Sequence, residues 1–132
     1  MTATILVVED DAAQRELLCK LLEDHGYACI SAEDGRRALD VIGGAGSPDV
    51  MVLDMVLPRL NGHELLAELG ARGEQTLGVV VLTGFGPVSR FADRSPLVRA
   101  VVQKPVDVHA LLEAVQSCVP SDAKPPRPTS LV

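Results

Sequence analysis

The stretch VMVLDMVLP at residues 50–58 decides the fold class of this chain. Its first four residues are all apolar, and the apolar run stops at Asp54. A short run that is apolar at every position predicts a strand buried on both faces, because a strand with one solvated face would alternate apolar and polar residues. Such strands are typical of the centre of a parallel sheet, so the stretch predicts a sheet with helices on both sides.

Similar runs recur and alternate with helical patterns. The predicted strands are short apolar segments at residues 4–8, 28–32, 50–53, 79–82 and 100–103. The predicted helices are amphipathic segments at residues 12–24 and 36–42, a segment after an Asn61 N-cap with Glu64 as its capping box, and a segment after an Asp107 N-cap. This alternation predicts an α/β fold, a doubly wound five-stranded parallel sheet with flanking helices. Glycines and prolines between Thr83 and Ala100 predict a short or irregular fourth helix.

Composition excludes several classes of function. The 132 residues carry a net charge of −6, so the basic face that nucleic acids and anionic membranes require is not expected. The aromatic residues are Tyr27, Phe85 and Phe91, which are too few to build a platform for stacked bases or a flavin. No apolar run approaches the roughly 18 residues of a membrane span.

Three cysteines, Cys19, Cys29 and Cys118, are widely spaced and form no CxxC motif. This pattern favours neither a disulfide scaffold nor a zinc site, and a reducing cytoplasm is the expected location. We expect all three side chains to act as small buried or half-buried hydrophobic groups.

Chemically active residues follow the predicted strands. They are Glu9, Asp10 and Asp11 after the first strand, Asp54 after the third, Thr83 after the fourth and Lys104 after the fifth. Because ligand sites in open parallel sheets form at the carboxyl ends of the strands, these side chains are expected at one edge. Clustered carboxylates repel one another unless a cation lies among them, and their oxygen atoms suit Mg²⁺. With a hydroxyl and an ammonium group they predict a phosphoryl site in which a carboxylate is the acceptor.

Four of these segments, in this order, resemble the receiver domain of two-component response regulators, which has a flavodoxin-like fold. They are the strand ending Val7-Val8-Glu9-Asp10, the segment from Asp54 to Pro58 with Asn61-Gly62 beyond it, Leu82-Thr83-Gly84, and Lys104-Pro105 with its expected cis peptide bond. The resemblance covers about residues 4–118. It implies a phosphoacceptor domain, and not an enzyme, that acts in a cytoplasmic phosphorelay.

The resemblance also implies a role for each residue. Asp54 would accept the phosphoryl group from a histidine kinase or a histidine phosphotransfer protein, and Thr83 and Lys104 would each contact a phosphoryl oxygen. The implied magnesium ligands are Asp10, Asp54, the backbone carbonyl of Val56 and, through water, Glu9. Asp11 is the third acid of its run, with a less defined part.

The chain departs from the family at its switch region. Many receivers have an aromatic residue three positions before the lysine, and this chain has Val101 there. Pro96 interrupts the fourth helix, so we expect output through a rearranged surface, with Phe85 or Phe91, or through another face. A second hypothesis is therefore a receiver-like binding module that signals without phosphorylation. An aspartyl phosphatase is disfavoured, because a general acid is usually expected two residues after the nucleophile and this chain has Val56 there.

The expected organisation is a receiver domain at residues 1–119 and a proline-rich, flexible tail at residues 120–132. Such a tail is too short for a DNA-binding domain, so we expect a single-domain regulator, monomeric or weakly dimeric, that acts on a downstream protein. The alternative is a receiver fragment of a larger hybrid kinase or regulator.

Overall fold

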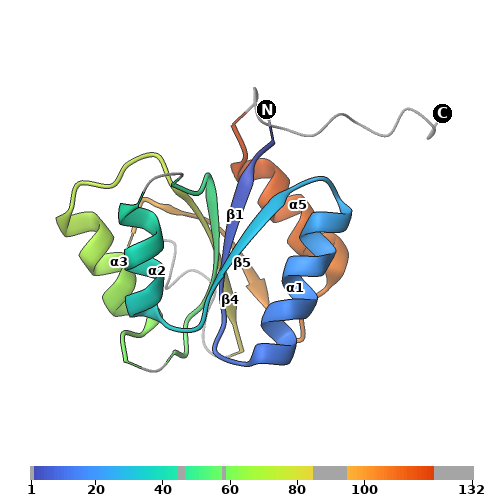
Figure 1. The fold of residues 1–132 in the computed structure, drawn as a ribbon, viewed down its shortest axis with the longest axis horizontal. Helices are drawn as coiled ribbons and strands as arrows, with labels where there is room; N and C mark the ends of the chain where they lie inside the picture. Colours follow the sequence, from blue (N-terminus) through green and yellow to red (C-terminus); the bar gives the residue numbers. More distant parts are fainter. Residues whose placement is uncertain (1, 45–46, 58, 85–94, 121–132) are drawn as a thin grey trace.

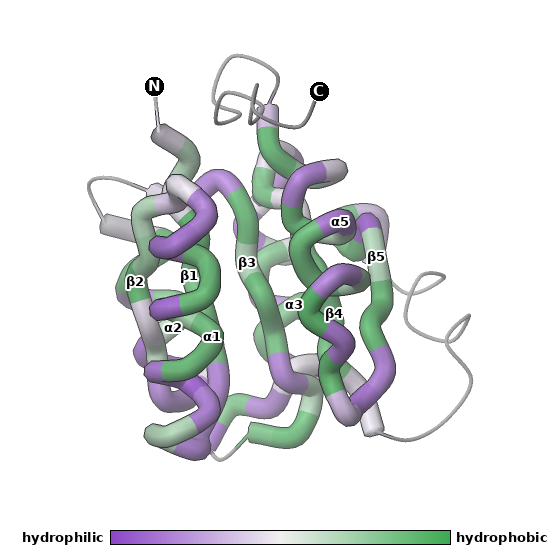
Figure 2. Tube along the Cα trace, turned by 90° about the vertical axis from the view of Figure 1, so that its right-hand side faces the viewer, coloured by the Kyte–Doolittle hydropathy of each residue, from purple (hydrophilic) through white to green (hydrophobic). Residues whose placement is uncertain are grey.

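Five parallel strands form the centre of the molecule in the computed structural model, which describes residues 2–44, 47–57, 59–84 and 95–120. The strands lie in the order β2-β1-β3-β4-β5, so β2 and β5 are the edges of the sheet (Figure 2). Their bounds are β1 Thr4–Val8, β2 Ala28–Ala32, β3 Val50–Asp54, β4 Gly78–Thr83 and β5 Val98–Gln103. This sheet confirms the predicted fold class, and three of the strands extend one or two residues beyond the predicted runs.

Helices cover both faces of the sheet (Figure 1). Helices α1 (Ala12–Asp24) and α5 (Val108–Cys118) lie on one face, and α2 (Gly35–Gly43) and α3 (Gly62–Ala71) lie on the other. Each of the four begins after an Asp or Asn whose side chain accepts a hydrogen bond from a backbone N–H of the first turn: Asp11, Asp34, Asn61 and Asp107. The predicted caps at Asn61 and Asp107 are confirmed, the former with the capping box to Glu64.

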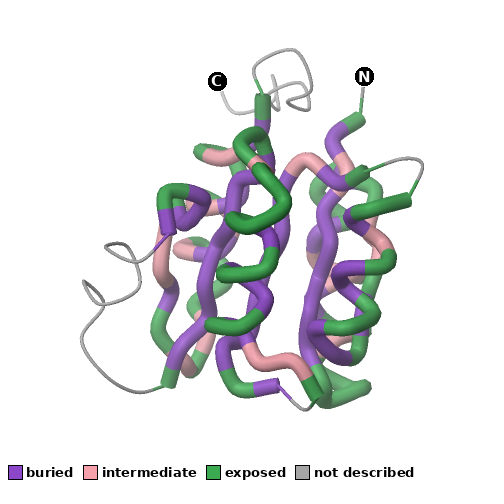
Figure 3. Tube along the Cα trace, turned by 90° about the vertical axis from the view of Figure 1, so that its left-hand side faces the viewer, coloured by how far each residue is buried: buried purple, intermediate pink, exposed green. Residues whose placement is uncertain are grey.

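The core consists of two aliphatic layers, one on each side of the sheet. Alternate residues of β3 serve different layers: Met51 and Leu53 pack toward α2 and α3, whereas Val50 and Val52 pack toward α1 and α5. Because both faces of β3 and β4 are covered, every residue of these strands is buried (Figure 3). The continuous apolar runs of the sequence follow from this double burial.

The amphipathic first helix, α1, buries Leu18 and Leu22 against the sheet but leaves Leu17 69% exposed. The predicted irregular fourth helix, with Phe85 and Phe91, falls largely on residues 85–94, which lie outside the described residues, as do residues 121–132 of the predicted tail. Among the described residues, no helix combines the length and the apolar character needed to cross a membrane.

Candidate functional site

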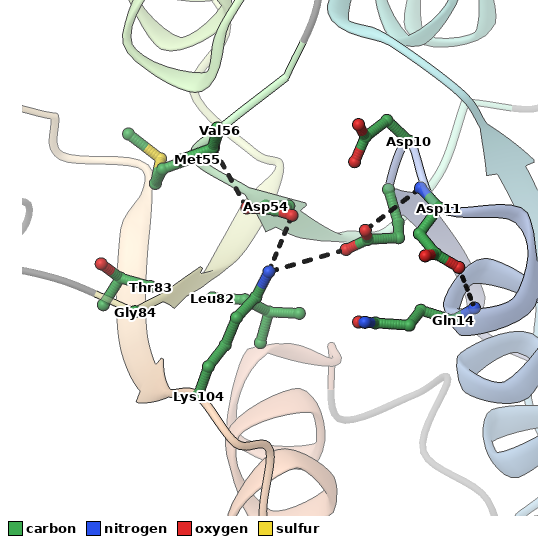
Figure 4. A pocket seen from close by; sticks show the side chains of 11 residues that line it. Asp10, Asp11, Gln14, Asp54, Met55, Val56, Leu82, Thr83, Gly84 and Lys104 are labelled. Carbon is green, nitrogen blue, oxygen red and sulfur yellow. Dashed lines mark hydrogen bonds and ion pairs between the residues drawn. The ribbon is translucent and has the colours of Figure 1, made fainter.

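The carboxyl ends of four strands meet around one pocket. Glu9 follows β1, Asp54 and Thr83 are the last residues of β3 and β4, and Lys104 follows β5. All four line the pocket, together with Asp10, Asp11, Gln14, Met55, Val56, Leu82 and Gly84 (Figure 4). The structure therefore brings together the strand-end residues that the sequence predicted at this edge of the sheet.

Lys104 joins the β5 side of the pocket to the acidic residues that follow β1 and end β3. Its Nζ atom lies 2.8 Å from Oδ2 of Asp54, although β4 separates their strands in the sheet. The lysine is anchored by its backbone N–H, which donates to the Thr83 carbonyl at 2.8 Å, and the peptide bond to Pro105 is cis, as the resemblance implied. The ammonium group is thus held at the acid cluster by the sheet itself.

Asp54 is buried, with 4% of its surface exposed, and each carboxylate oxygen has a partner. Oδ2 accepts from Lys104, and Oδ1 accepts from the backbone N–H of Val56 at 3.0 Å. The Val56 side chain itself is 73% exposed beside the pocket. A carboxylate held in one orientation at the base of an open pocket is accessible to an electrophile from the solvent side.

Glu9 has fewer hydrogen-bond partners than Asp54, the other buried carboxyl group of the pocket. Only 2% of its surface is exposed; Oε1 accepts a 3.3 Å hydrogen bond from the backbone N–H of Asp11, while Oε2 is buried with no hydrogen-bond partner. The Lys104 ammonium lies 4.0 Å from Oε2, which is beyond hydrogen-bond distance. Arg15 braces the loop by donating from Nη1 to the backbone carbonyls of Glu9 at 2.8 Å and Asp10 at 3.4 Å.

Electrostatics in the pocket follow from this crowding. Burial, and secondarily the adjacent Asp54 carboxylate, raise the pKa of Glu9 from 4.5 to about 7. Burial opposes the charge of Lys104, but its hydrogen bond to Asp54 and the charges of Asp54 and Glu9 outweigh this and raise its pKa. One ammonium group does not balance the negative charge of this pocket near neutral pH.

The acids fit a divalent cation. One carboxylate oxygen each from Glu9, Asp10 and Asp54 lies within 4.8 Å of the others. Hard oxygen donors of this kind are the ligands Mg²⁺ takes, usually with water completing the octahedron. The Oε2 atom of Glu9 is buried without a hydrogen-bond partner, and the Lys104 ammonium is shared with Asp54, so this donor set has room for further positive charge.

The remaining predicted residues occupy different environments. Thr83 is buried at the pocket wall beside Gly84 (Figure 4). Asp11 caps α1, since its side chain accepts from the backbone N–H of Gln14 at 3.0 Å, so a structural role accounts for this third acid. Val101 is half-buried in β5 and packs against the core layer under α2 and α3. Phe85, the other predicted switch residue, lies outside the described part of the chain.

Sequence reasoning missed the packing that fixes the loop after Asp54. The backbone N–H of Gly62 donates to the Met55 carbonyl at 3.2 Å. A Cβ atom at Gly62 would lie 2.6 Å from Sδ and 2.8 Å from Cα of Met55, so only glycine permits this approach. Arg59 in the same loop has a positive φ of 65° and lies 3.8 Å from Asp34, the cap of α2. The Asn61-Gly62 pair was the available signal for a close turn here.

Comparison with known proteins places these features in a family. The sequence-family model of the response regulator receiver domain matches residues 5–116 of this chain. Response regulator MprA of Mycolicibacterium vanbaalenii is 45% identical over 89 residues, which are 67% of this chain and 38% of that protein. The chain thus spans less than two fifths of the length of such curated relatives.

Solved receiver structures have the same architecture. A response regulator receiver protein from Pseudomonas putida, 27% identical, superimposes with a TM-score of 0.79 over 89% of this chain and 98% of its own. A CheY-like receiver domain from Methylobacillus flagellatus, 28% identical, gives a TM-score of 0.75 over 89% of this chain and 99% of its own.

Proposed function

Because this chain belongs to the response regulator receiver domain family, we propose that it accepts a phosphoryl group on Asp54 from a histidine kinase or a histidine phosphotransfer protein. Receiver domains are the phosphoacceptors of two-component signalling rather than classical enzymes. The family therefore supports the class of reaction, and the pocket residues would supply the atoms that carry it out in this chain.

The observation that carries the proposal is the setting of the Asp54 carboxylate. It is buried, its Oδ1 accepts from the Val56 N–H, and its Oδ2 lies 2.8 Å from the Lys104 ammonium. In the proposed step an Asp54 oxygen attacks the phosphorus of a phosphohistidine. The new P–O bond forms as the P–N bond breaks, and the electron pair of that bond leaves with the imidazole nitrogen.

The surrounding side chains would stabilise charge on the transferred group. Lys104 would exchange its Asp54 partner for a phosphoryl oxygen, and the Thr83 hydroxyl would donate to another. Glu9 (through water), Asp10, Asp54 and the Val56 carbonyl would hold Mg²⁺, which when bound neutralises the acids and the phosphoryl oxygens. The oxygen cluster and the buried Glu9 Oε2, which has no hydrogen-bond partner, support this set.

Output would pass through a protein partner. We propose that residues 1–119 act as the receiver domain and that phosphorylation alters their affinity for that partner. The half-buried Val101 stands where many receivers carry a switching aromatic residue, so the conformational response in this chain would involve other side chains.

The test is covalent labelling of the full chain by a small phosphodonor, acetyl phosphate, with and without Mg²⁺. Intact-mass spectrometry should show the gain of one phosphoryl group in the presence of Mg²⁺, and Asp54→Asn should abolish it. Asp40→Asn provides the matched control, because Asp40 is an exposed acid on α2, away from the pocket, and this variant should be labelled like the wild type.

Absence of labelling in the wild type, with the fold intact by circular dichroism, would refute the acceptor role and favour a phosphorylation-independent binding module. Labelling that persists in Asp54→Asn would place the acceptor elsewhere. Phosphotransfer profiling against candidate histidine kinases, with the same two variants, would then identify the donor protein.

A further inference from the structure

A pair of thiols lies away from the phosphoryl pocket. Cys19 is in the middle of α1 and Cys29 is the second residue of the edge strand β2, elements that lie side by side in Figure 1. The Cys29 thiol donates a hydrogen bond to Sγ of Cys19, and the two sulfur atoms are 2.6 Å apart. A disulfide bond measures 2.03–2.05 Å, so the sulfurs need to approach by only about 0.5 Å to become bonded.

The position of the pair leaves it within reach of small reagents. Both residues pack against the rim of the core layer under α1 and α5 and are half-buried rather than enclosed. Cys29 pairs through its backbone with Ile5 of β1, so its side chain projects from a fixed strand register. Cys118, the third cysteine, is on α5, and its sulfur is near Ser117 instead. The cysteines are half-buried, as predicted, but the sequence did not predict the contact between Cys19 and Cys29.

The two thiols are chemically unequal. The hydrogen bond from Cys29 lowers the pKa of Cys19, although burial and the charge of Glu23 oppose this effect. The same contact, with burial and the charges of Cys19 and Glu23, raises the pKa of Cys29. A thiol that ionises more easily is the better attacking group, and its neighbour is then placed to resolve the product.

We propose that Cys19 and Cys29 form a reversible disulfide that ties α1 to the edge strand β2, with a small-molecule disulfide of the glutathione type as the oxidant. In the first step the Cys19 thiolate attacks one sulfur of the oxidant, which forms a mixed disulfide and releases one small thiolate. In the second step the Cys29 sulfur, after losing its proton, attacks the Cys19 sulfur and releases the second small thiolate. The protein loses two electrons, and its two protons end on the two small thiols.

The crosslink would close a short loop between residues that already touch in the folded chain. A disulfide of this kind restricts the unfolded chain without requiring a new native arrangement. In a reducing compartment such bonds are transient and act as redox sensors. This site is independent of Asp54, so an Asp54→Asn chain is expected to oxidise like the wild type.

The experiment exposes the full native chain to glutathione disulfide, quenches with acid, and then alkylates the unfolded chain with a maleimide. Reduced protein should carry three alkyl groups and oxidised protein one, with peptide mapping placing that one on Cys118 and joining Cys19 to Cys29. Dithiothreitol should restore all three. The Cys118→Ser chain serves as the matched control and should still form the bond, whereas Cys29→Ser should stop at the mixed disulfide on Cys19.

A second measurement uses stability. The oxidised chain should unfold at a Tm higher by roughly 5–15 °C than the reduced chain. Continued alkylation of both Cys19 and Cys29, a bond that includes Cys118, or crosslinking only between chains would each overturn the proposal. A crosslink that lowers Tm would overturn the claim that the native geometry accommodates it.

Discussion

Replacement of Glu9 by glutamine should stabilise the metal-free protein, and only at a pH where the native carboxyl group is charged. Glu9 is buried with one oxygen that has no hydrogen-bond partner, so its charged form is poorly accommodated. Glutamine has nearly the same shape as the protonated carboxyl group and keeps an oxygen that can accept from the Asp11 N–H. The substitution thus removes the charge while preserving the packing.

The size of the effect follows from proton linkage. The pKa of Glu9 is raised from 4.5 to about 7, so the stability that this group contributes is fully present below pH 4.5 and is lost as the pH rises through 7. Converted at about 1.36 kcal/mol per pH unit, the shift corresponds to an upper limit of about 3 kcal/mol. The pocket opens to solvent, which screens the charge, and we therefore expect Glu9→Gln to be more stable by about 1–3 kcal/mol at pH 8 and equal to the wild type near pH 4.5.

Urea unfolding with a chelator present, at pH 8 and at pH 4.5, measures this difference. For a small domain the expected stabilisation moves the midpoint by roughly 1 M urea at pH 8. Addition of Mg²⁺ at pH 8 should stabilise the wild type more than the variant and so narrow the gap, because binding to the native state adds stability by mass action. Glu113→Gln, at an exposed position on α5, is the control and should not change the midpoint at either pH.

Two results would refute the reasoning. If Glu9→Gln is no more stable than the wild type at pH 8 without metal, the buried carboxylate is not a source of instability. If the gain is equally large at pH 4.5 and pH 8, the variant acts through packing and not through charge.

Three further substitutions test other parts of the site and its support. Lys104→Ala should lower the unfolding free energy of the metal-free chain by about 1–3 kcal/mol at pH 8, because the buried carboxylates of Glu9 and Asp54 lose their cation. Urea unfolding should show a smaller loss at pH 4.5. An equal loss at both pH values would contradict the electrostatic account. Gly62→Ala should destabilise by about 1–3 kcal/mol because its methyl group meets Met55 at 2.6–2.8 Å. Its control, Gly70→Ala, has open space in the same helix and should be neutral or stabilising by up to about 1 kcal/mol, and equal thermal shifts in the two variants would count against the close-approach argument. Asn61→Ala removes the α3 capping box and should cost about 1 kcal/mol by urea unfolding, with an unchanged midpoint as the contrary result.

The strand-end residues could be predicted from the sequence because a parallel sheet imposes their convergence. Glu9, Asp54, Thr83 and Lys104 each follow or end an apolar run, and the carboxyl ends of parallel strands share an edge. The family resemblance then assigned roles that the spacing alone does not give.

Other features depend on three-dimensional detail that periodicity does not contain. Whether Asp11 caps a helix or joins the acid cluster is decided by backbone angles at one loop. The exposure of Leu17 and the contact between Cys19 and Cys29 both depend on how α1 is rotated over the sheet. A helical pattern defines an apolar face only to within about one residue, so neither could be inferred from it.

The lysine that contacts Asp54 directly follows the edge strand β5, and this position links the site to local unfolding. Within the part of the chain that the structure describes, β5 pairs only with β4, so it can separate from the sheet more easily than β3 or β1 can. Each such opening would withdraw Lys104 from the carboxylates, and an anion held by the ammonium group would in turn oppose the opening. Amide hydrogen exchange in β5 should therefore slow when Asp54 is phosphorylated, which would make the edge strand a reporter of the state of the pocket.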